Sequence, residues 1–316
     1  MNLIKLNTQF FLVKFPIIFP VLYGFFLYQF PSFETALITL TILLLAETHF
    51  GATWPFFLNK VNYFYIKENK IGLIVIPLII IFSSIIGFFL INKLFLLIFF
   101  AANIFHVTRQ SFGVCKLYSK KKTENDFQEI FIYIVNFILF LIGFFRFYFP
   151  VINETNILYI NLILILFFIF LFFFYLFKFK FSENFLIFIT GCLIFSPICF
   201  VNNPVHAIIM GVTMHYTQYL YLTYNVCELR KKISNERNNS ILLKKISNYL
   251  IVVVFYAIFM TIFSAFSKFE QSNIKNLILI PILGQMLHFY LDSQLWKFSV
   301  KYNRDNTLFH ISKFIK

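Results

Sequence analysis

Residues 157–177 read ILYINLILILFFIFLFFFYLF, an apolar run that contains no charged residue. A transmembrane helix needs about 20 consecutive apolar residues, so this run is long enough to cross a bilayer. The whole 316-residue chain has the same character, being 60% hydrophobic and only 13% charged. Soluble domains are roughly 45–50% apolar and about 25% charged. The sequence therefore predicts an all-α, multi-pass membrane protein.

Ten such hydrophobic segments occur along the chain, each near the length that a membrane-spanning helix needs. They predict a bundle of about ten transmembrane helices and a single transmembrane domain over residues 1–316. The first segment contains Pro16 and Pro20 and no small-residue cleavage site, which favours a retained helix over a signal peptide. The segments cover residues 10–30, 35–58, 71–91, 94–117, 127–149, 157–177, 185–201, 205–228, 249–267 and 276–298.

The basic residues are distributed unevenly between the two ends of these segments. Of the 27 Lys and Arg, 21 lie in the N-terminus, the loops after even-numbered segments and the C-terminal tail, and three lie in the loops after odd-numbered segments. Positively charged loops remain cytoplasmic, so both termini are predicted on the cytoplasmic side of a bacterial-type inner membrane. The net charge of +14 is thus explained by topology and by contact with anionic membrane lipids near residues 230–248, and no nucleic-acid partner is predicted.

Four histidines lie inside apolar segments, each on an even-numbered helix: His49, His106, His215 and His288. At 1.5 Å per residue, three of them lie about 14–16 Å from the basic residue that ends their helix, and His215 lies about 22 Å from it. Even-numbered helices run in the same direction, so these imidazoles are predicted to share one level of the membrane. Ionisable groups at that depth are costly and indicate a functional site.

Polar residues accompany each histidine. Residues three and four positions apart share one face of a helix, so most of these residues form a stripe with their histidine. A carboxylate or amide that orients an imidazole is typical of the surroundings of a metal ligand. The candidates are Asn103, Arg109 and Gln110 around His106; Gln218 and Tyr219 after His215; Gln285 and Asp292 around His288; and Glu47 beside His49.

Two simpler interpretations apply to single residues. A buried histidine can hydrogen-bond a neighbouring helix and stabilise packing alone. Arg109 can extend its charge to the headgroups, or it can bind an anionic substrate group or a haem propionate. His206 is expected at the membrane interface, and His310 is expected to be solvated in the C-terminal tail.

The sequence lacks the HExxH pair of zincins, the HxxxH and HxxHH boxes of membrane desaturases, and the Walker A motif. The architecture, with its many helices and four intramembrane histidines, resembles the bacterial β-carotene dioxygenase family of the Brp/Blh type. That resemblance implies a single non-haem iron held by the four histidines and a carotenoid substrate. The Pro-His-Gly signature of the family is replaced by Thr48-His49-Phe50-Gly51. The strings FHVTRQSFG, MHYTQYLYL and HFYLDSQLW around the other histidines are more similar to those of a separate group of bacterial membrane proteins.

The preferred hypothesis is a membrane-embedded oxidoreductase with an Fe(II) centre bound by His49, His106, His215 and His288. Imidazole suits iron, copper, zinc and nickel, and a lipid, isoprenoid or carotenoid would reach the site through the bilayer. Three alternatives remain open. They are a b-type haem protein with two axial histidines, a metal-free transporter or lipid-handling protein with a polar cytoplasm-facing cavity, and an acyltransferase with one catalytic histidine.

Overall fold

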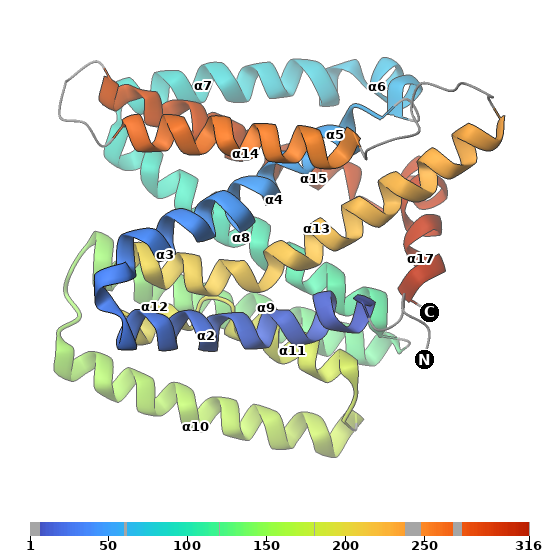
Figure 1. Cartoon of the computed structure of the whole chain (residues 1–316). Coiled ribbons are helices and arrows are strands. Elements are labelled where there is room, and N and C mark those ends of the chain that lie inside the picture. Colours follow the sequence, from blue (N-terminus) through green and yellow to red (C-terminus); the bar gives the residue numbers. More distant parts are fainter. Residues whose placement is uncertain are drawn as a thin grey trace. The chain divides into compact units, whose positions relative to one another are not determined.

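The computed structural model describes residues 7–59, 62–119, 121–179, 181–237, 248–267 and 274–315, without the side chains of residues 154, 231–237 and 248. Most of these residues are helical, and none of them forms a strand (Figure 1). The α-helices are α2 Phe15–Gln29, α3 Glu34–Thr41, α4 Glu47–Gly51, α5 Thr53–Phe57, α6 Tyr63–Glu68, α7 Ile76–Leu90, α8 Asn92–Tyr118, α9 Lys122–Gly143, α10 Glu154–Phe179, α11 Glu183–Leu193, α12 Pro197–Phe200, α13 Pro204–Arg237, α14 Asn248–Phe266, α15 Leu279–Leu295, α16 Lys301–Asn303 and α17 Phe309–Ile315.

Short segments of other helical types continue or join these helices. Five are π-helical and two are 3₁₀ turns, and most of the π segments continue directly into an α-helix. The π segments are η1 Phe10–Lys14, η3 Ile42–Ala46, η5 Ile71–Val75, η6 Phe144–Tyr148 and η9 Arg304–Leu308, and the 3₁₀ turns are η2 Pro31–Phe33 and η8 Ile274–Ile278.

Eight helices of the described residues are long and apolar enough to cross a membrane. They coincide with eight of the ten predicted segments, which confirms an all-α protein of multi-pass character. Segment 185–201 is not one continuous helix, because α11 ends at Leu193 and α12 begins at Pro197. Proline has no N–H to bond the preceding turn, which accounts for the interruption. Segment 205–228 is helical within the longer α13, whose last turns are basic and polar.

The predicted orientation of the termini stays a prediction. Part of the charge distribution that supports it, and most of the basic stretch 230–248, lie outside the described residues. The affected basic residues are Lys5, Lys60, Lys120, Lys180, Lys244, Lys245, Lys268 and Lys316.

The chain divides into two compact units. Unit 1 comprises Met1–Ile38 and Ile104–Gln218, and unit 2 comprises Thr39–Asn103 and Tyr219–Lys316. Each unit is therefore assembled from two separate parts of the sequence. The predicted single domain over residues 1–316 stays a prediction.

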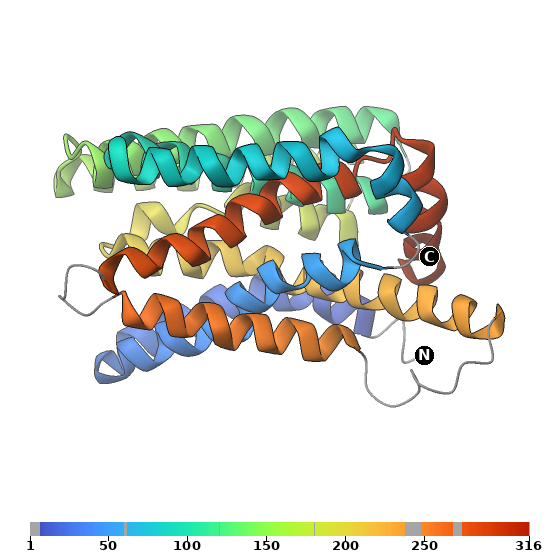
Figure 2. The same cartoon turned by 90° about the horizontal axis from the view of Figure 1, so that it is seen from above.

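In unit 2, α15 lies between α7 and α14, as the red, cyan and orange helices in Figure 2 show. Helix α14 also packs along α4 and α5. Two glycines permit this close approach, because a Cβ at Gly51 would lie 2.9 Å from the Tyr256 ring and one at Gly284 would overlap the Tyr256 hydroxyl. Tyr256 of α14 thus fits against both α4 and α15. These are the helices that carry His49 and His288.

In unit 1, α9 packs against α11 and α12. The Asn136 side chain joins them by donating to the carbonyls of Ile132 and Gly191, at 2.8 and 2.9 Å. A Cβ at Gly211 of α13 would overlap the backbone carbonyl of Ile194, so this position requires glycine. The unit is held together by close backbone contact and by amide–carbonyl bonds between helices.

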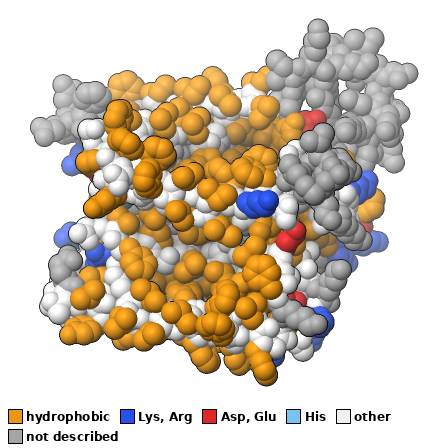
Figure 3. Space-filling model, turned by 60° about the horizontal axis from the view of Figure 1, so that its bottom comes forward, with side chains coloured by type: hydrophobic (Ala, Val, Ile, Leu, Met, Phe, Trp, Pro, Cys, Tyr) orange, Lys and Arg blue, Asp and Glu red, His pale blue; other side chains and the backbone are white. Residues whose placement is uncertain are grey.

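Large apolar side chains cover much of the described surface. Figure 3 shows hydrophobic side chains over most of the described part of one face. Helix α10 is the clearest case, with Phe177 93% and Leu158 67% exposed. Exposed apolar surface this extensive marks an interaction with other apolar material, and for helices of this length the natural solvent is the bilayer.

Candidate metal centre

His49 lies where its helix changes geometry twice. The π segment η3 ends at Ala46 and α4 begins at Glu47. Pro55 cannot donate a hydrogen bond to the Gly51 carbonyl, so the helix is interrupted at Ala52 before α5 begins at Thr53. His49, which is fully buried, and Thr53, four residues later, remain on one side of this interrupted helix. Such π segments occur frequently at functional sites.

His49 and His288 come together inside unit 2. Their ring centroids are 4.6 Å apart, and each offers a ring nitrogen within 4.8 Å of the other. His288 lies on α15 and is 1% exposed. Tyr219 of α13 completes this cluster, with its ring centroid 4.5 Å from that of His49.

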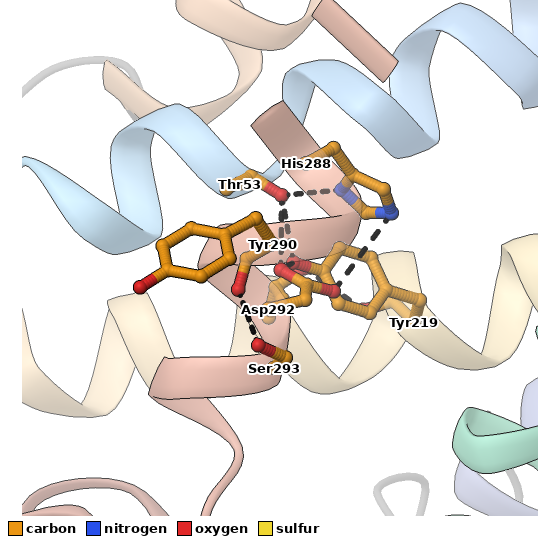
Figure 4. A network of polar contacts seen from close by, with 7 residues as sticks. Thr53, Tyr219, His288, Tyr290, Asp292 and Ser293 are labelled. Atoms are coloured by element: carbon orange, nitrogen blue, oxygen red, sulfur yellow. Dashed lines mark hydrogen bonds and ion pairs between the residues drawn. The ribbon is translucent and has the colours of Figure 1, made fainter. Parts of the chain in front are cut away.

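Thr53, Tyr219 and Asp292 form a hydrogen-bonded network with His288, as the dashed lines in Figure 4 show. The Thr53 Oγ1 atom lies 2.6 Å from His288 Nδ1 and 3.1 Å from Asp292 Oδ1. The Tyr219 hydroxyl donates to the same Asp292 oxygen at 2.6 Å. All of these side chains are buried, and Asp292 is 2% exposed.

This network favours one tautomer of His288, the one with the proton on Nδ1. Thr53 has one hydroxyl hydrogen, and it donates that hydrogen to the carboxylate of Asp292. Its oxygen therefore accepts from Nδ1–H of His288, which leaves the lone pair of a neutral imidazole on Nε2. Fixing the tautomer through the other ring nitrogen is the usual support for a histidine that binds metal.

The remaining distance in the cluster fits a shared cation. His288 Nε2 lies 3.8 Å from Asp292 Oδ2, which is too long for a hydrogen bond. Metal–nitrogen and metal–oxygen bonds are about 2.0–2.2 Å, so two ligands of one ion can lie up to about 4 Å apart. One ion between these two atoms would therefore require little movement.

The other predicted residues of unit 2 are Glu47, Asn103 and Gln285. Glu47 is 2% exposed and its carboxylate accepts a hydrogen bond from the Gln285 side chain. Asn103 is buried on α8. Glu47 and Gln285 thus interact with each other across α4 and α15, and they stabilise the packing of the two helices that carry the histidines.

His106 and His215 belong to unit 1, and both are buried. His215 Nδ1 lies 2.5 Å from the Val212 carbonyl, so Nδ1 carries the proton and the lone pair of the neutral ring is on Nε2. The Gln218 side chain donates to the Leu12 carbonyl at 2.8 Å, which joins α13 to η1. Gln110 is half-buried and Arg109 is exposed. The convergence of all four histidines stays a prediction.

The structure corrects the expectation for His310, whereas the interfacial position of His206 stays a prediction. His206 is 1% exposed within the protein, because its ring lies between the Tyr23 hydroxyl and the Glu34 carboxylate, 2.7 Å from each. His310 is 6% exposed rather than solvated, because the chain after α15 folds back through α16 and η9 into α17. Burial and the positive charges of Arg230 and Lys313 lower the pKa of His310 to about 4.

The sequence did not indicate Thr53 as a residue of the site. The available signal was its position four residues after His49, which places both on one helix face. A threonine in an apolar segment is ordinary, so the spacing alone did not distinguish it. Tyr219 was selected as a neighbour of His215, whereas its hydroxyl bonds Asp292 within unit 2.

Comparison of the chain with models of protein families, with curated proteins and with solved structures gave no match.

Proposed function

We propose that this protein is a membrane-embedded metalloprotein, and that its metal centre is a non-haem iron site used for oxidoreductase chemistry on an apolar substrate. The observation that carries the proposal is the pair His49 and His288, with ring nitrogens within 4.8 Å of one another beside the buried carboxylate of Asp292. Two imidazoles and a carboxylate form a ligand set typical of non-haem iron.

The hydrogen bonds around His288 support this assignment. The chain from Nδ1 through Thr53 to Asp292 orients the ring and directs the lone pair of Nε2 toward the second Asp292 oxygen. A carboxylate buried this deeply favours a cation nearby, because the local dielectric screens its charge poorly. On the sequence argument, His106 and His215 are proposed as further ligands from unit 1.

The spacing favours a single ion over a haem between His49 and His288. Two axial nitrogens of one haem iron are about 4 Å apart, with both ring centroids farther out. The observed centroid separation of 4.6 Å leaves no room for a porphyrin between these two rings.

An apolar groove of about 360 Å³ supports an apolar substrate. It is lined by Trp54, Ile251, Val252, Phe255, Tyr256 and Phe259. Tyr256 lines this groove and also lies against Gly51 of α4 and Gly284 of α15, so the groove adjoins the helices that carry the two histidines. A lipid, isoprenoid or carotenoid is the proposed substrate class, and a bound ion would supply the redox centre.

Metal analysis by mass spectrometry, with an optical spectrum of the detergent-purified protein, tests the proposal. We expect near-stoichiometric iron without a Soret band, and loss of that iron in His49→Ala and His288→Ala proteins that retain their helical circular dichroism. His206→Ala is the matched control, because it removes a buried histidine bonded only to a tyrosine and a glutamate in the described structure.

Full metal content in both alanine variants would exclude this site. A Soret band would instead support a haem protein. A folded protein with neither iron nor haem would support a metal-free polar cavity, and proton-dependent uptake into vesicles would then be measured.

A further inference from the structure

Arg230 is buried in unit 2 at the end of the apolar part of α13. The side chain is 3% exposed. Its Nε and Nη2 atoms donate to the Asn306 carbonyl at 2.9 and 2.7 Å, and Nη2 also donates to Thr307 Oγ1 at 2.9 Å. The guanidinium carbon lies 4.7 Å from the centre of the Phe56 ring. These contacts hold the guanidinium in one position.

Among the side chains that the structure describes, none supplies a carboxylate that pairs with this guanidinium. Among the described residues Arg230 forms no ion pair, and its buried Nη1 atom has no hydrogen-bond partner. The ionisable groups that favour its charged form are Cys227 and Tyr302, both of which are neutral at pH 7. A buried charge is costly unless a counter-charge and hydrogen bonds satisfy it.

Two further buried ring nitrogens belong to residues that are linked to Arg230, one through Phe56 and one through its charge. Trp296 stacks on Phe56 with ring centroids 5.4 Å apart, and its Nε1–H has no partner in the described structure. His310 Nδ1 is also buried without a partner there, and the Arg230 charge acts on this ring. Lys313 of α17 adds a second positive charge, while Asp305 of η9 is exposed. The surroundings therefore combine two buried ring nitrogens and the charge of Lys313 with one half-buried acid, Glu228, two residues from Arg230.

The position of Arg230, at the end of the apolar part of α13, indicates where a ligand would come from. Tyr65 and Tyr302 stack with ring centroids 4.5 Å apart just beyond the apolar segments. Tyrosine and tryptophan concentrate at the level of the lipid headgroups. Arginine binds phosphate oxygens strongly at such places.

We propose that Arg230 is the centre of a binding site for a phosphate group, with Nη1–H, His310 and Trp296 as the donors that complete it. The phosphate belongs either to a phospholipid headgroup or to free phosphate. This site is independent of the proposed metal centre, because it uses none of the same residues.

The test uses full-length, delipidated protein in detergent, with inorganic phosphate and phosphatidylglycerol mixed micelles as separate probes. We expect the melting temperature of the wild-type protein to rise saturably with one probe at constant ionic strength. Arg230→Gln keeps a donor for the Asn306 carbonyl and removes the charge, and at least a tenfold weaker half-saturation is expected. Arg304→Gln is the matched control, because Arg304 is exposed and donates to the carbonyls of Phe298 and Ser299.

A response to inorganic phosphate alone identifies free phosphate as the ligand, and a response to phosphatidylglycerol alone identifies a lipid headgroup. Equal responses in the Arg230 and Arg304 variants, or no saturable response in the wild-type protein, would overturn the site and leave Arg230 as a structural contact. A second readout does not depend on the variant folding. In the wild-type protein, the bound probe should raise the pKa of His310 from about 4 toward its ordinary value, measured by NMR of labelled histidine. An unchanged His310 titration at saturating probe would also overturn the proposal.

Discussion

In both units a described, buried imidazole bonds a hydroxyl and lies near a carboxylate, and the two arrangements differ in the burial of the carboxylate. In unit 1, His206 lies between Tyr23 and Glu34, and the Glu34 side chain is 46% exposed. In unit 2, His288 connects through Thr53 to Asp292, which is 2% exposed. A hydroxyl, an imidazole and a carboxylate are thus combined once with a half-exposed carboxylate and once with a buried one.

The difference in the burial of the carboxylate decides whether each arrangement suits a cation. In unit 1 both ring nitrogens of His206 are within 2.7 Å of a protein oxygen, so the imidazole is fully used in joining α2, the start of α3 and α13. Water screens the charge of Glu34. In unit 2 the carboxylate is buried and His288 Nε2 lies 3.8 Å from it, a geometry that suits a cation. The hydrogen-bonded group of Tyr23, His206 and Glu34, here called the clasp, is therefore structural. The group around His288 is the proposed metal centre.

The largest expected effect comes from Asp292→Asn. The substitution keeps the shape and removes the charge proposed to face the ion. We expect the affinity for iron to fall by about 10–100-fold, the usual effect of losing a group that supports a metal ligand. Metal titration of the stripped protein measures it. Unchanged affinity would make the Asp292 carboxylate equivalent to that of Glu34 and remove the distinction between the two units.

Thr53→Val should have the next largest effect, because valine has a similar shape and cannot accept from His288 Nδ1. We expect about tenfold weaker iron binding and a loss of about 1–3 kcal/mol in the free energy of unfolding, since buried donors lose their partner. The same metal titration, followed by chemical denaturation, measures both quantities. A stability loss with full metal affinity would make Thr53 structural only.

Tyr23→Phe removes the corresponding hydroxyl of unit 1. We expect a loss of about 1 kcal/mol in the free energy of unfolding, the typical value for one hydrogen bond between neutral groups, and unchanged iron content. Denaturation and metal analysis of the same sample check the two halves of this prediction. A loss of iron would contradict the assignment of the clasp as purely structural.

The smallest effect is expected for Glu34→Gln. The carboxylate is half-exposed, and exposed ion pairs contribute about 0–1 kcal/mol to stability. The amide oxygen of glutamine can still accept from His206 Nε2. Denaturation at low and high salt should therefore give nearly the same free energy of unfolding for both proteins. A loss comparable to that of Tyr23→Phe would show that Glu34 carries more of the clasp than its exposure indicates.

Membrane helices could be predicted from the sequence because their signal is local. An uncharged run such as 157–177 has no other stable solution in a bilayer than a helix, since the backbone must satisfy its own hydrogen bonds. The same local rule failed at 185–201, where hydropathy continues through Pro197 although the helix does not. A hydropathy profile reports how apolar the side chains are. It does not report that proline lacks the backbone N–H that a continuous helix needs.

Three residues of the candidate site could be predicted by the same kind of local reasoning. His49 and His288 are predicted because ionisable groups in apolar segments are costly, and Asp292 because it lies four residues after His288. The structure places all three together in unit 2. His206 is expected at the membrane interface because it lies near a segment end, and His310 is expected near water because it lies in the C-terminal tail. Their burial depends on Tyr23, Glu34 and the return of the chain after α15, none of which a single helix reveals.

The sequence by itself determined the all-α class, most of the helices and the positions of polar groups within apolar segments, because each depends on neighbouring residues. Only the tertiary structure decided which groups share a proton or a charge. Thr53 is 235 positions from His288 and 239 from Asp292, and Tyr219 is 73 positions from Asp292. These pairs arise where α14 packs on α4 and α15 through Gly51 and Gly284. The rotation and register of packed helices place the hydroxyls beside the imidazole, and no local pattern encodes them.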